Sequence, residues 1–202
     1  MTPETREAGA ICEVRWLGHA CFLISAGGKT LVTDPYGRDT GGYRMPEVRA
    51  DVVTISHEHF DHNAADAVGG RPKVVRGLTG GGKDWAQPAA EVDGIRIDLV
   101  KSHHDASGGR ERGKNSIFIL DFSALGGPVI AHLGDLGHEL GSVEIQRLSG
   151  VEVLLVPVGG TYTIGPEAAS SLVAKLAARI VIPMHYRTPQ VKDWPLRPVD
   201  DF

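Results

Sequence analysis

The chain has 202 residues, of which 42% are hydrophobic, and its formal net charge is −4. This length suits one domain with a sizeable core, and the negative charge argues against general binding to nucleic acid or to an anionic membrane. Residues 1–9 are polar and no apolar run approaches membrane-spanning length, so the sequence predicts no signal peptide and a cytoplasmic location. We expect a flexible tail over residues 1–10 and a single domain over residues 11–202.

The first part of the chain predicts three short strands joined by tight turns, over residues 11–17, 20–25 and 29–33. A turn at positions 18–19 would place Cys12 opposite Ser25 and Cys21 opposite Trp16. This register argues against a disulfide, and we interpret both thiols as small buried hydrophobic groups.

The next predicted strand leads into a histidine-rich turn. Residues 51–55 form a short apolar, β-branched run typical of a buried strand, and His57, His59, Asp61 and His62 follow it closely. Crowding these groups on one turn costs hydration and charge repulsion, and a divalent cation would remove both problems. Two neighbouring cations accommodate four ligands more easily than one. The alternative is a solvated histidine-rich turn without a ligand.

The remaining segments predict further strands and a few helices. The clearest helix begins at Pro166, because proline suits the first turn and Glu167 suits the helix dipole. Periodicity and composition predict strands over residues 73–75, 94–102, 115–121, 151–156 and 180–182, short helices over residues 63–68 and near Trp85, and a longer helix over residues 136–148.

A short internal repeat relates the two halves of the chain. Hairpins with a Gly-Gly turn are predicted over residues 22–34 and 118–135, and the second strand of each runs toward an aspartate, Asp34 or Asp135. Such a repeat fits two sheets packed face to face, with a site at their shared edge.

Five motifs resemble those of the metallo-β-lactamase superfamily, in the same order. His57-x-His59-x-Asp61-His62 resembles its second motif. The segments that contain Asp34, His104, Asp135 and His185 resemble its first, third, fourth and fifth motifs, respectively. The resemblance covers residues 11–187 and implies the four-layer αββα sandwich of that superfamily. Within it, Gly18-His19 is similar to the branch that contains ascorbate-6-phosphate lactonase and the N-acyl-phosphatidylethanolamine phospholipase D.

The resemblance also implies a dinuclear metal site. It implies that His57, His59 and His104 hold one ion, that Asp61, His62 and His185 hold the other, and that Asp135 bridges the two. Zinc is the expected metal, although histidine and aspartate ligands also accept manganese and iron. A water between the two cations would lose a proton near neutral pH and attack the substrate, and Asp61 would orient it.

Two residues near the implied site have alternative interpretations. Asp34 would accept a proton from a ligand imidazole and fix its orientation, or it caps the turn after its strand. His19 would donate a proton or bind substrate near the metals, or it is a turn histidine without a role.

Three other histidines are expected to lie outside the ligand set. Neighbouring residues of a strand point to opposite sides, so only one of His103 and His104 faces inward, and we choose His104. We expect His132 and His138 to be structural.

The leading hypothesis is a metal-dependent hydrolase of a small ester-like, lactone or phosphodiester bond. The alternatives are a diiron redox protein, whose usual pattern has a glutamate where His59 stands, and a non-catalytic metal-binding module. Arginines predicted in loops could rim the site and favour an anionic small-molecule substrate. They are Arg38, Arg44, Arg110 and Arg112. The oligomeric state is left open, and a homo-oligomer is allowed.

Overall fold

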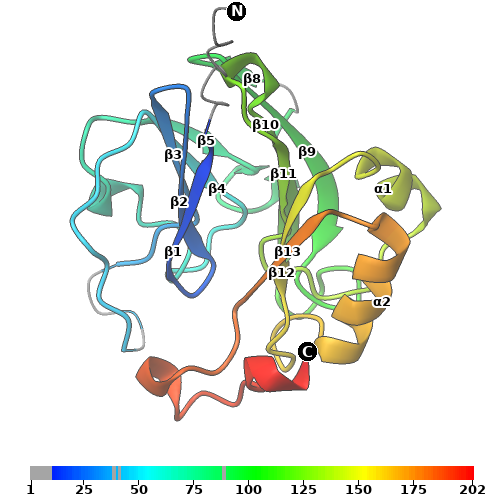
Figure 1. Cartoon of the computed structure of the whole chain (residues 1–202). Helices are drawn as coiled ribbons and strands as arrows, with labels where there is room; N and C mark the ends of the chain where they lie inside the picture. The colour runs from blue at the N-terminus through cyan, green and yellow to red at the C-terminus, as the bar shows by residue number, and fades with distance from the viewer. Residues whose placement is uncertain (1–10, 38–39, 41, 88–89) are drawn as a thin grey trace, which may run out of the picture.

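The computed structural model describes residues 11–37, 40, 42–87 and 90–202. The tail predicted over residues 1–10, and Arg38, lie outside the described residues. Two β-sheets face each other, and the helices α1 and α2 cover the outer face of one of them (Figure 1).

The first sheet has the strand order β1-β2-β3-β4-β5. Its first three strands are antiparallel and its last three are parallel, so the chain crosses over between β3 and β4 and between β4 and β5. The five strands are β1 (Glu13–Gly18), β2 (Cys21–Ala26), β3 (Lys29–Thr33), β4 (Val52–Ile55) and β5 (Lys73–Arg76).

The second sheet has the order β13-β12-β11-β10-β9-β8. Strands β8 to β11 are antiparallel, and β11, β12 and β13 are parallel. Helix α1 (Ser142–Arg147) precedes β12 and helix α2 (Pro166–Leu176) precedes β13. The six strands are β8 (Ala90–Val92), β9 (Ile95–His103), β10 (Lys114–Asp121), β11 (Val129–His132), β12 (Val153–Pro157) and β13 (Ile180–Met184).

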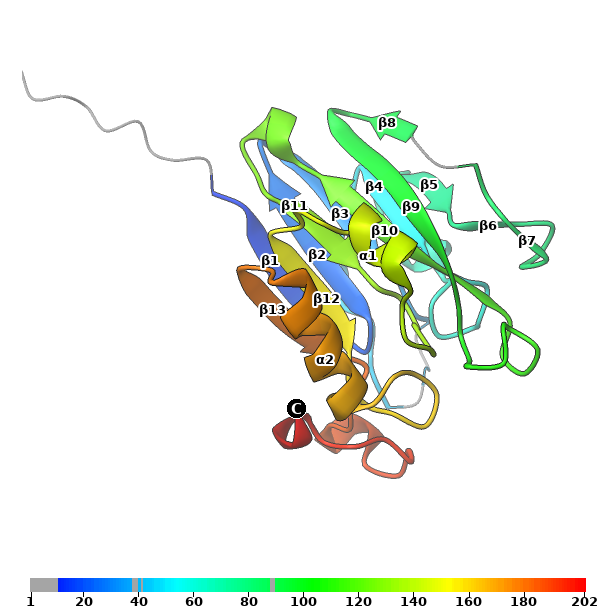
Figure 2. The ribbon, with the colours of Figure 1, turned by 90° about the vertical axis from the view of Figure 1, so that its right-hand side faces the viewer.

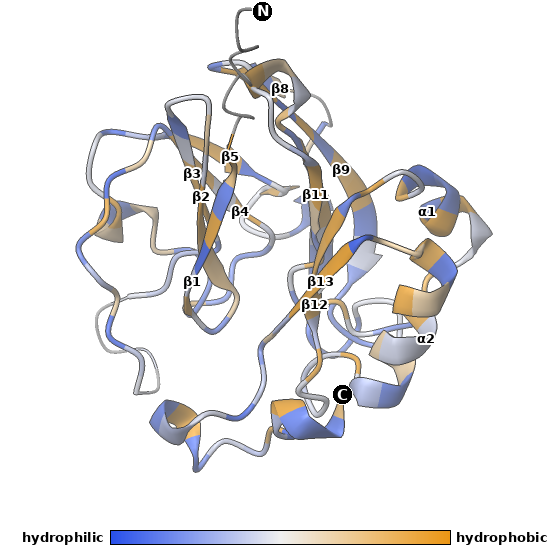
Figure 3. Ribbon diagram, viewed as in Figure 1, coloured by the Kyte–Doolittle hydropathy of each residue, from blue (hydrophilic) through white to orange (hydrophobic). Residues whose placement is uncertain are grey.

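Strand alternation builds three apolar layers around these sheets, and the strands carry most of the hydrophobic colour in Figure 3. In β12, Val153 and Leu155 enter the core between the sheets, whereas Leu154 and Val156 pack under the helices. In β3, Leu31 faces the same central core. Both faces of the central strands are therefore covered, which explains why β12 is apolar throughout.

The outer face of the first sheet is covered by irregular chain. Tyr36, Tyr43, Met45 and Val48 pack there beside a single turn of 3₁₀-helix, η1 (Ala65–Ala67). The predicted αββα sandwich is confirmed, and its first outer layer is thin because the predicted helix over residues 63–68 shortens to this one turn.

Two helix predictions are wrong for reasons of hydrogen bonding. Only Ser142–Arg147 of the predicted helix 136–148 is helical, because the earlier residues bond to other elements: Gly137 N donates to His103 O and Leu136 O accepts from Ile164 N. The segment near Trp85 is instead a small hairpin, β6 (Leu78–Thr79) with β7 (Asp84–Trp85).

The first hairpin has a different register from the predicted one. Gly18 pairs with Cys21 because the turn lies at positions 19–20, one residue later than predicted. A bulge between Trp16 and Gly18 then shifts the outer pairs by one residue, so that Glu13 pairs with Ser25. Cys12 lies before β1, and both cysteines are free.

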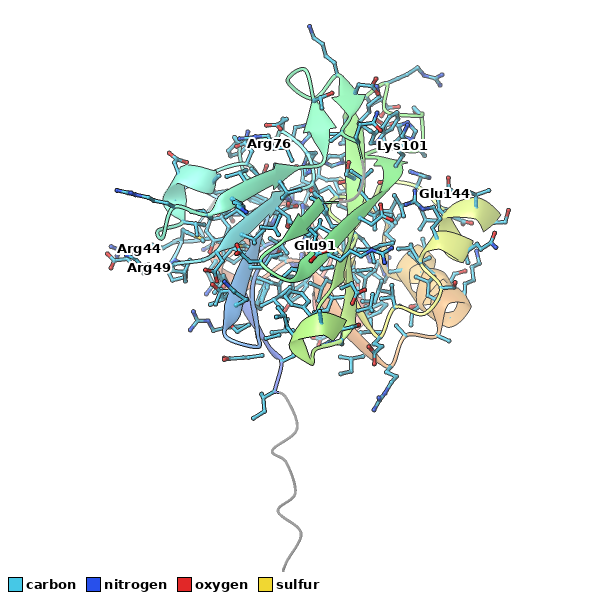
Figure 4. All side chains as sticks on the ribbon, turned by 90° about the horizontal axis from the view of Figure 1, so that it is seen from above. Arg44, Arg49, Arg76, Glu91, Lys101 and Glu144 are labelled. Carbon is cyan, nitrogen blue, oxygen red and sulfur yellow. The ribbon has the colours of Figure 1, made fainter. Side chains whose placement is uncertain are left out.

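Residues 186–202 run beneath both sheets in two turns of 3₁₀-helix, η3 (Pro189–Val191) and η4 (Val199–Asp201) (Figures 1 and 2). The hydroxyls of Tyr43 and Thr188 lie 2.9 Å apart and tie this C-terminal segment to the first sheet's outer layer. Seen from above, the labelled Arg44 and Arg49 lie at one side of the molecule and Glu144 lies at the opposite side (Figure 4). Among the described residues, no helix is long and apolar enough to cross a membrane.

Candidate metal centre

The predicted ligands meet at one edge of the sandwich, where several strands end. Asp34 follows β3, the turn from His57 to His62 follows β4, and His104 follows β9. Asp135 follows β11 and His185 follows β13, while His19 occupies the turn between β1 and β2. Strand ends hold these side chains rigidly, because the strands themselves are fixed in the core.

Asp135 lies at the middle of the cluster. Its Oδ2 is 3.0 Å from Nε2 of His104, 3.2 Å from Nε2 of His185, 3.4 Å from Nε2 of His62 and 3.9 Å from Nε2 of His57. All five side chains are buried. The structure therefore brings the predicted bridging carboxylate to histidines of both implied ion sites.

The remaining predicted ligands fall into two groups beside Asp135. His57, His59 and His104 each offer a ligand atom within 4.8 Å of the others, and so do His62, His185 and His19. Asp61 Oδ2 is 3.2 Å from His19 Nε2 and 3.8 Å from His62 Nε2. All seven predicted ligands are thus in one cluster, and His19 adds an eighth side chain.

Several buried polar atoms of the cluster have no hydrogen-bond partner among the described residues. They are His57 Nε2, His104 Nδ1, His185 Nδ1 and Asp135 Oδ1. Leaving such an atom unpaired costs about 1–3 kcal/mol. His57 Nε2 and Asp135 Oδ1 lie within the cluster, where a further group could bind them, whereas His104 and His185 face Asp135 with Nε2, the ring nitrogen opposite the unpaired one. Imidazole and carboxylate groups are the ligands that zinc, manganese and iron prefer, and this donor set therefore fits divalent ions.

Asp34 contacts the candidate ligand His62 and the neighbouring Ser56. Its carboxylate accepts hydrogen bonds from Ser56 N at 2.7 Å and Ser56 Oγ at 2.5 Å, and it lies 3.0 Å from His62 Nδ1. When His62 donates from Nδ1 to this carboxylate, its Nε2 lone pair points into the cluster.

The backbone at the site is held in a sparsely populated conformation. The φ angles of His19, Asp34 and His185 are 54°, 37° and 52°, in the left-handed region that non-glycine residues seldom adopt. Such strain costs about 1–3 kcal/mol per residue and is concentrated at functional sites.

Sequence reasoning missed Asn115, which supports the turn that carries Asp135. Its Oδ1 accepts a hydrogen bond from Asp135 N at 3.0 Å, and its Nδ2 donates to Ser102 Oγ and to Leu133 O. Gly134 makes room for it, since a Cβ at Gly134 would lie 2.4 Å from Asn115 Oδ1. The sequence feature that could have indicated this role is a polar amide at the start of an otherwise apolar strand.

Burial and the neighbouring carboxylates shift the pKa values of the histidines in opposite directions. Burial lowers the pKa of His57 well below its usual value, and burial followed by His185 lowers the pKa of His19 to about 4. Burial also opposes the charged form of His62, but Asp135 and Asp34 outweigh it and raise the pKa of His62. Neutral His57 and His19 have free lone pairs, which is the form that binds metals.

The histidines expected to lie outside the ligand set make other contacts. His132 Nε2 donates to Ala20 O at 2.8 Å and its Nδ1 accepts from Gly134 N at 3.3 Å, so both ring nitrogens serve the backbone. The ring of half-buried His103 packs against Trp85 and His138, with centroids 5.3 and 5.5 Å away. Of the adjacent pair, His104 is the one beside Asp135, as predicted.

A cavity of about 740 Å³ opens over the cluster. Among the predicted arginines, Arg112 lines this cavity, Arg110 is exposed in the same loop, and Arg44 lines a separate cavity. His19 is not among the described residues that line it. The lining residues are Glu58, His59, Phe60, Asp61, His104, Arg112, Asp135, Tyr162, His185, Asp193, Trp194 and Pro195.

Comparison with known proteins agrees with this geometry. The β-lactamase superfamily domain matches residues 13–185, which include every predicted ligand. The chain belongs to the metallo-β-lactamase superfamily. Its αββα sandwich is therefore the fold of the superfamily, as the five motifs implied.

Individual relatives of the superfamily are similar over nearly the whole chain. A UPF0173 metal-dependent hydrolase of Pelotomaculum thermopropionicum is 33% identical, covering 91% of this chain and 86% of its own length. Another, from Thermococcus onnurineus, is 32% identical with coverage of 91% and 86%. A crystal structure from Thermotoga maritima, named as a candidate Zn-dependent hydrolase of this superfamily, is 39% identical with a TM-score of 0.74, covering 95% of this chain and 84% of its own.

Proposed function

We propose that this protein is a metal-dependent hydrolase that uses two divalent ions to cleave an ester-like, lactone or phosphodiester bond of a small molecule. The observation that carries the proposal is the position of Asp135 Oδ2 within 3.9 Å of Nε2 atoms from four histidines. The relatives named as metal-dependent hydrolases support the same conclusion. We infer that a protein with this centre acts on a substrate in the cavity above it.

The ligands divide between two ions as the motifs imply. His57, His59 and His104 would hold the first ion, and Asp135 would reach both. Asp61, His62 and His185 would hold the second. Zinc is the metal that we propose, because histidine-rich sites with a few carboxylates suit it and because a relative at 39% identity carries that name.

Bound ions would lower the pKa of a water and polarise the bond to be cleaved. The protein supplies the orientation. Asp61 lines the cavity with a side chain that is 14% exposed, and it is ionised, since the hydrogen bond from His19 and nearby His62 outweigh burial and lower its pKa. We infer that Asp61 accepts a hydrogen bond from the attacking water and directs it at the substrate.

His19 would act through Asp61 and the second ion. Its Nε2 lies 3.2 Å from Asp61 Oδ2 and 3.1 Å from His62 Nε2, and His19 is not among the described residues that line the cavity. A neutral imidazole there can serve as a further ligand, or it can donate a hydrogen bond that fixes the Asp61 carboxylate. These positions favour such a role over direct contact with substrate, which was one of the sequence-based interpretations.

The experiment is a hydrolysis screen with the protein reconstituted with zinc, manganese or iron. We expect turnover of at least one ester, lactone or phosphodiester that disappears with a chelator, returns with the metal, and falls by two or more orders of magnitude in Asp61→Asn. Two bound ions without turnover in any of these substrate classes would favour the non-catalytic alternative. Iron as purified, with reduction of oxygen, would favour the redox alternative.

A further inference from the structure

Three aromatic side chains from distant parts of the chain form the walls of the cavity over the metal centre. Phe60 lies in the ligand turn itself, between His59 and Asp61, and Tyr162 lies in the loop before α2. Trp194 belongs to the C-terminal segment, which lies beyond the residues that match the superfamily. Tyr162 and Trp194 therefore come from segments that carry none of the candidate ligands.

Two of these aromatic groups offer apolar surface to a ligand. The side chain of Phe60 is 71% exposed, although a large apolar group gains free energy by leaving water. Trp194 is half-buried and fixed: its N donates to Val191 O at 3.0 Å, and its ring packs edge-on against His19 at 5.5 Å. A rigid indole and an exposed phenyl beside a metal centre are suited to hold a flat apolar group.

Among the described residues that line the cavity, Arg112 is the one arginine or lysine. Its backbone N donates to Asp105 Oδ2 at 2.8 Å, and its guanidinium lies 5.5 Å from the centroid of the Tyr162 ring. Within the described chain its ion pair is a 3.8 Å contact with Glu111, whose side chain is 62% exposed. The planar guanidinium therefore retains donors for a bidentate oxyanion.

The acidic groups of the wall limit how much negative charge fits. Glu58 is already engaged, since Arg76 Nη1 donates to both of its carboxylate oxygens at 2.9 and 2.7 Å. Asp193 also lines the cavity, is exposed, and would repel a second anionic group. This arrangement favours a substrate with one oxyanion beside an apolar body.

We propose that the cavity selects substrates that combine an aromatic or similarly flat apolar group, held by Phe60 and Trp194, with one carboxylate or phosphate paired by Arg112. The inference rests on the proposed function, because the bond to be cleaved must lie over the metal centre. It deepens that function by naming the substrate class and the residues that recognise it.

Hydroxamates test this selection without knowledge of the substrate, because each presents the same metal-binding group with a different tail. Binding to the zinc-reconstituted protein is measured by calorimetry for acetohydroxamate, benzohydroxamate and the 3- and 4-carboxy derivatives of benzohydroxamate. We expect the aromatic ring to tighten binding about tenfold. One carboxylate isomer should add about a further fivefold, and this second gain should shrink as salt is raised.

Matched variants assign each gain to its residue. Phe60→Ala, at an exposed side chain that the fold does not need, should remove most of the gain from the ring. Arg112→Gln should remove the gain from the carboxylate and keep the gain from the ring. Arg110→Gln, in the same loop but exposed and outside the cavity lining, should retain both. The 4-carbamoyl derivative, which is neutral, should bind no better than benzohydroxamate.

The outcomes separate this proposal from the one on which it rests. Binding of acetohydroxamate with no gain from ring or carboxylate, or the same gains in Phe60→Ala and Arg112→Gln, would overturn the selection and leave the hydrolase intact. A reconstituted protein that contains no metal and binds none of the hydroxamates would overturn the proposed function, and the selection with it.

Discussion

One carboxylate oxygen of Asp135 approaches the Nε2 atoms of four histidines, at 3.0 to 3.9 Å. A single oxygen cannot form good hydrogen bonds with four ring nitrogens at once, and several neighbouring polar atoms have no partner among the described residues. Shared cations account for this crowding more simply than hydrogen bonds do, because each cation takes lone pairs from several of these groups.

The adjacent pair His103 and His104 provides a matched test of the centre. His104→Ala removes a ring whose Nε2 is 3.0 Å from Asp135 Oδ2, so we expect kcat/KM of the reconstituted protein to fall about 100-fold or more. His103→Ala removes a half-buried ring that packs on Trp85 and should change kcat/KM less than about threefold. Equal losses in the two variants would contradict the choice of His104.

At the scale of elements, one aspartate organises the loop that joins β9 to β10. The Asp105 carboxylate accepts backbone hydrogen bonds from Ser107, Gly109, Glu111 and Arg112, at 2.8 to 3.1 Å. This loop follows His104 directly and carries Arg112 to the cavity wall. Asp105 therefore links the metal centre to the surface that we propose for substrate selection.

We expect Asp105→Ala to lower the free energy of unfolding by about 1–3 kcal/mol, because it leaves four backbone donors without their acceptor. Asp98→Ala is the control: it breaks an exposed ion pair with Arg147 and should cost less than about 1 kcal/mol. Denaturant unfolding measures both. A smaller loss in Asp105→Ala than in Asp98→Ala would show that the loop does not depend on this carboxylate.

Helix α2 ends at an alanine in a conformation that suits glycine. Ala177 is exposed and has φ 51° and ψ 36°. We expect Ala177→Gly to raise the free energy of unfolding by about 0.5–1 kcal/mol, since glycine adopts this conformation without a steric cost. Ala174→Gly, at an exposed position inside the helix, should lower it by about 1 kcal/mol, and the same sign for both changes would refute the explanation.

The sequence predicted strands better than helices, and the reason lies in where hydrogen bonds go. Alternating or wholly apolar runs predicted β3, β9 and β12 nearly to their observed bounds. Such prediction is possible because the burial of one or both faces of a strand determines which neighbouring residues are apolar. Residues 136–140 carry a helix-like composition, but their backbone bonds to Ile164 and His103, which no local pattern reveals.

The residues of the candidate site were also predictable only in part. The clustering of the candidate ligands could be predicted, because each is a histidine or aspartate at or just after a strand end, in a motif whose order resembles that of the superfamily. The cavity wall could not, because Phe60, Tyr162 and Trp194 come together only in the folded chain. Asn115 was missed for the same reason, since its contacts to Ser102 and Asp135 cross three segments.

At the scale of the whole molecule, the metal centre joins the two sheets. His57 and His62 come from the first sheet, whereas His104, Asp135 and His185 come from the second. Ions bound between them would act as cross-links that exist only in the folded protein.

Metal removal should therefore destabilise the entire sandwich. At an ion concentration of about 100 times each dissociation constant, one bound ion adds about 2.7 kcal/mol to the free energy of unfolding, and two ions add about 5.4 kcal/mol. For a chain of this size we expect the reconstituted protein to melt roughly 10–20 °C above the chelated protein. Thermal unfolding with the His104→Ala variant as control measures this, and an unchanged melting temperature would argue against ions between the sheets.

The number of divalent ions per chain tests the central claim most directly. Elemental analysis of the reconstituted and dialysed protein should give about two ions per chain for the unaltered sequence and for His103→Ala, and clearly fewer for His104→Ala and His185→Ala. Two ions retained in all four proteins, or none in the unaltered one, would contradict the assignment of these side chains to a dinuclear centre.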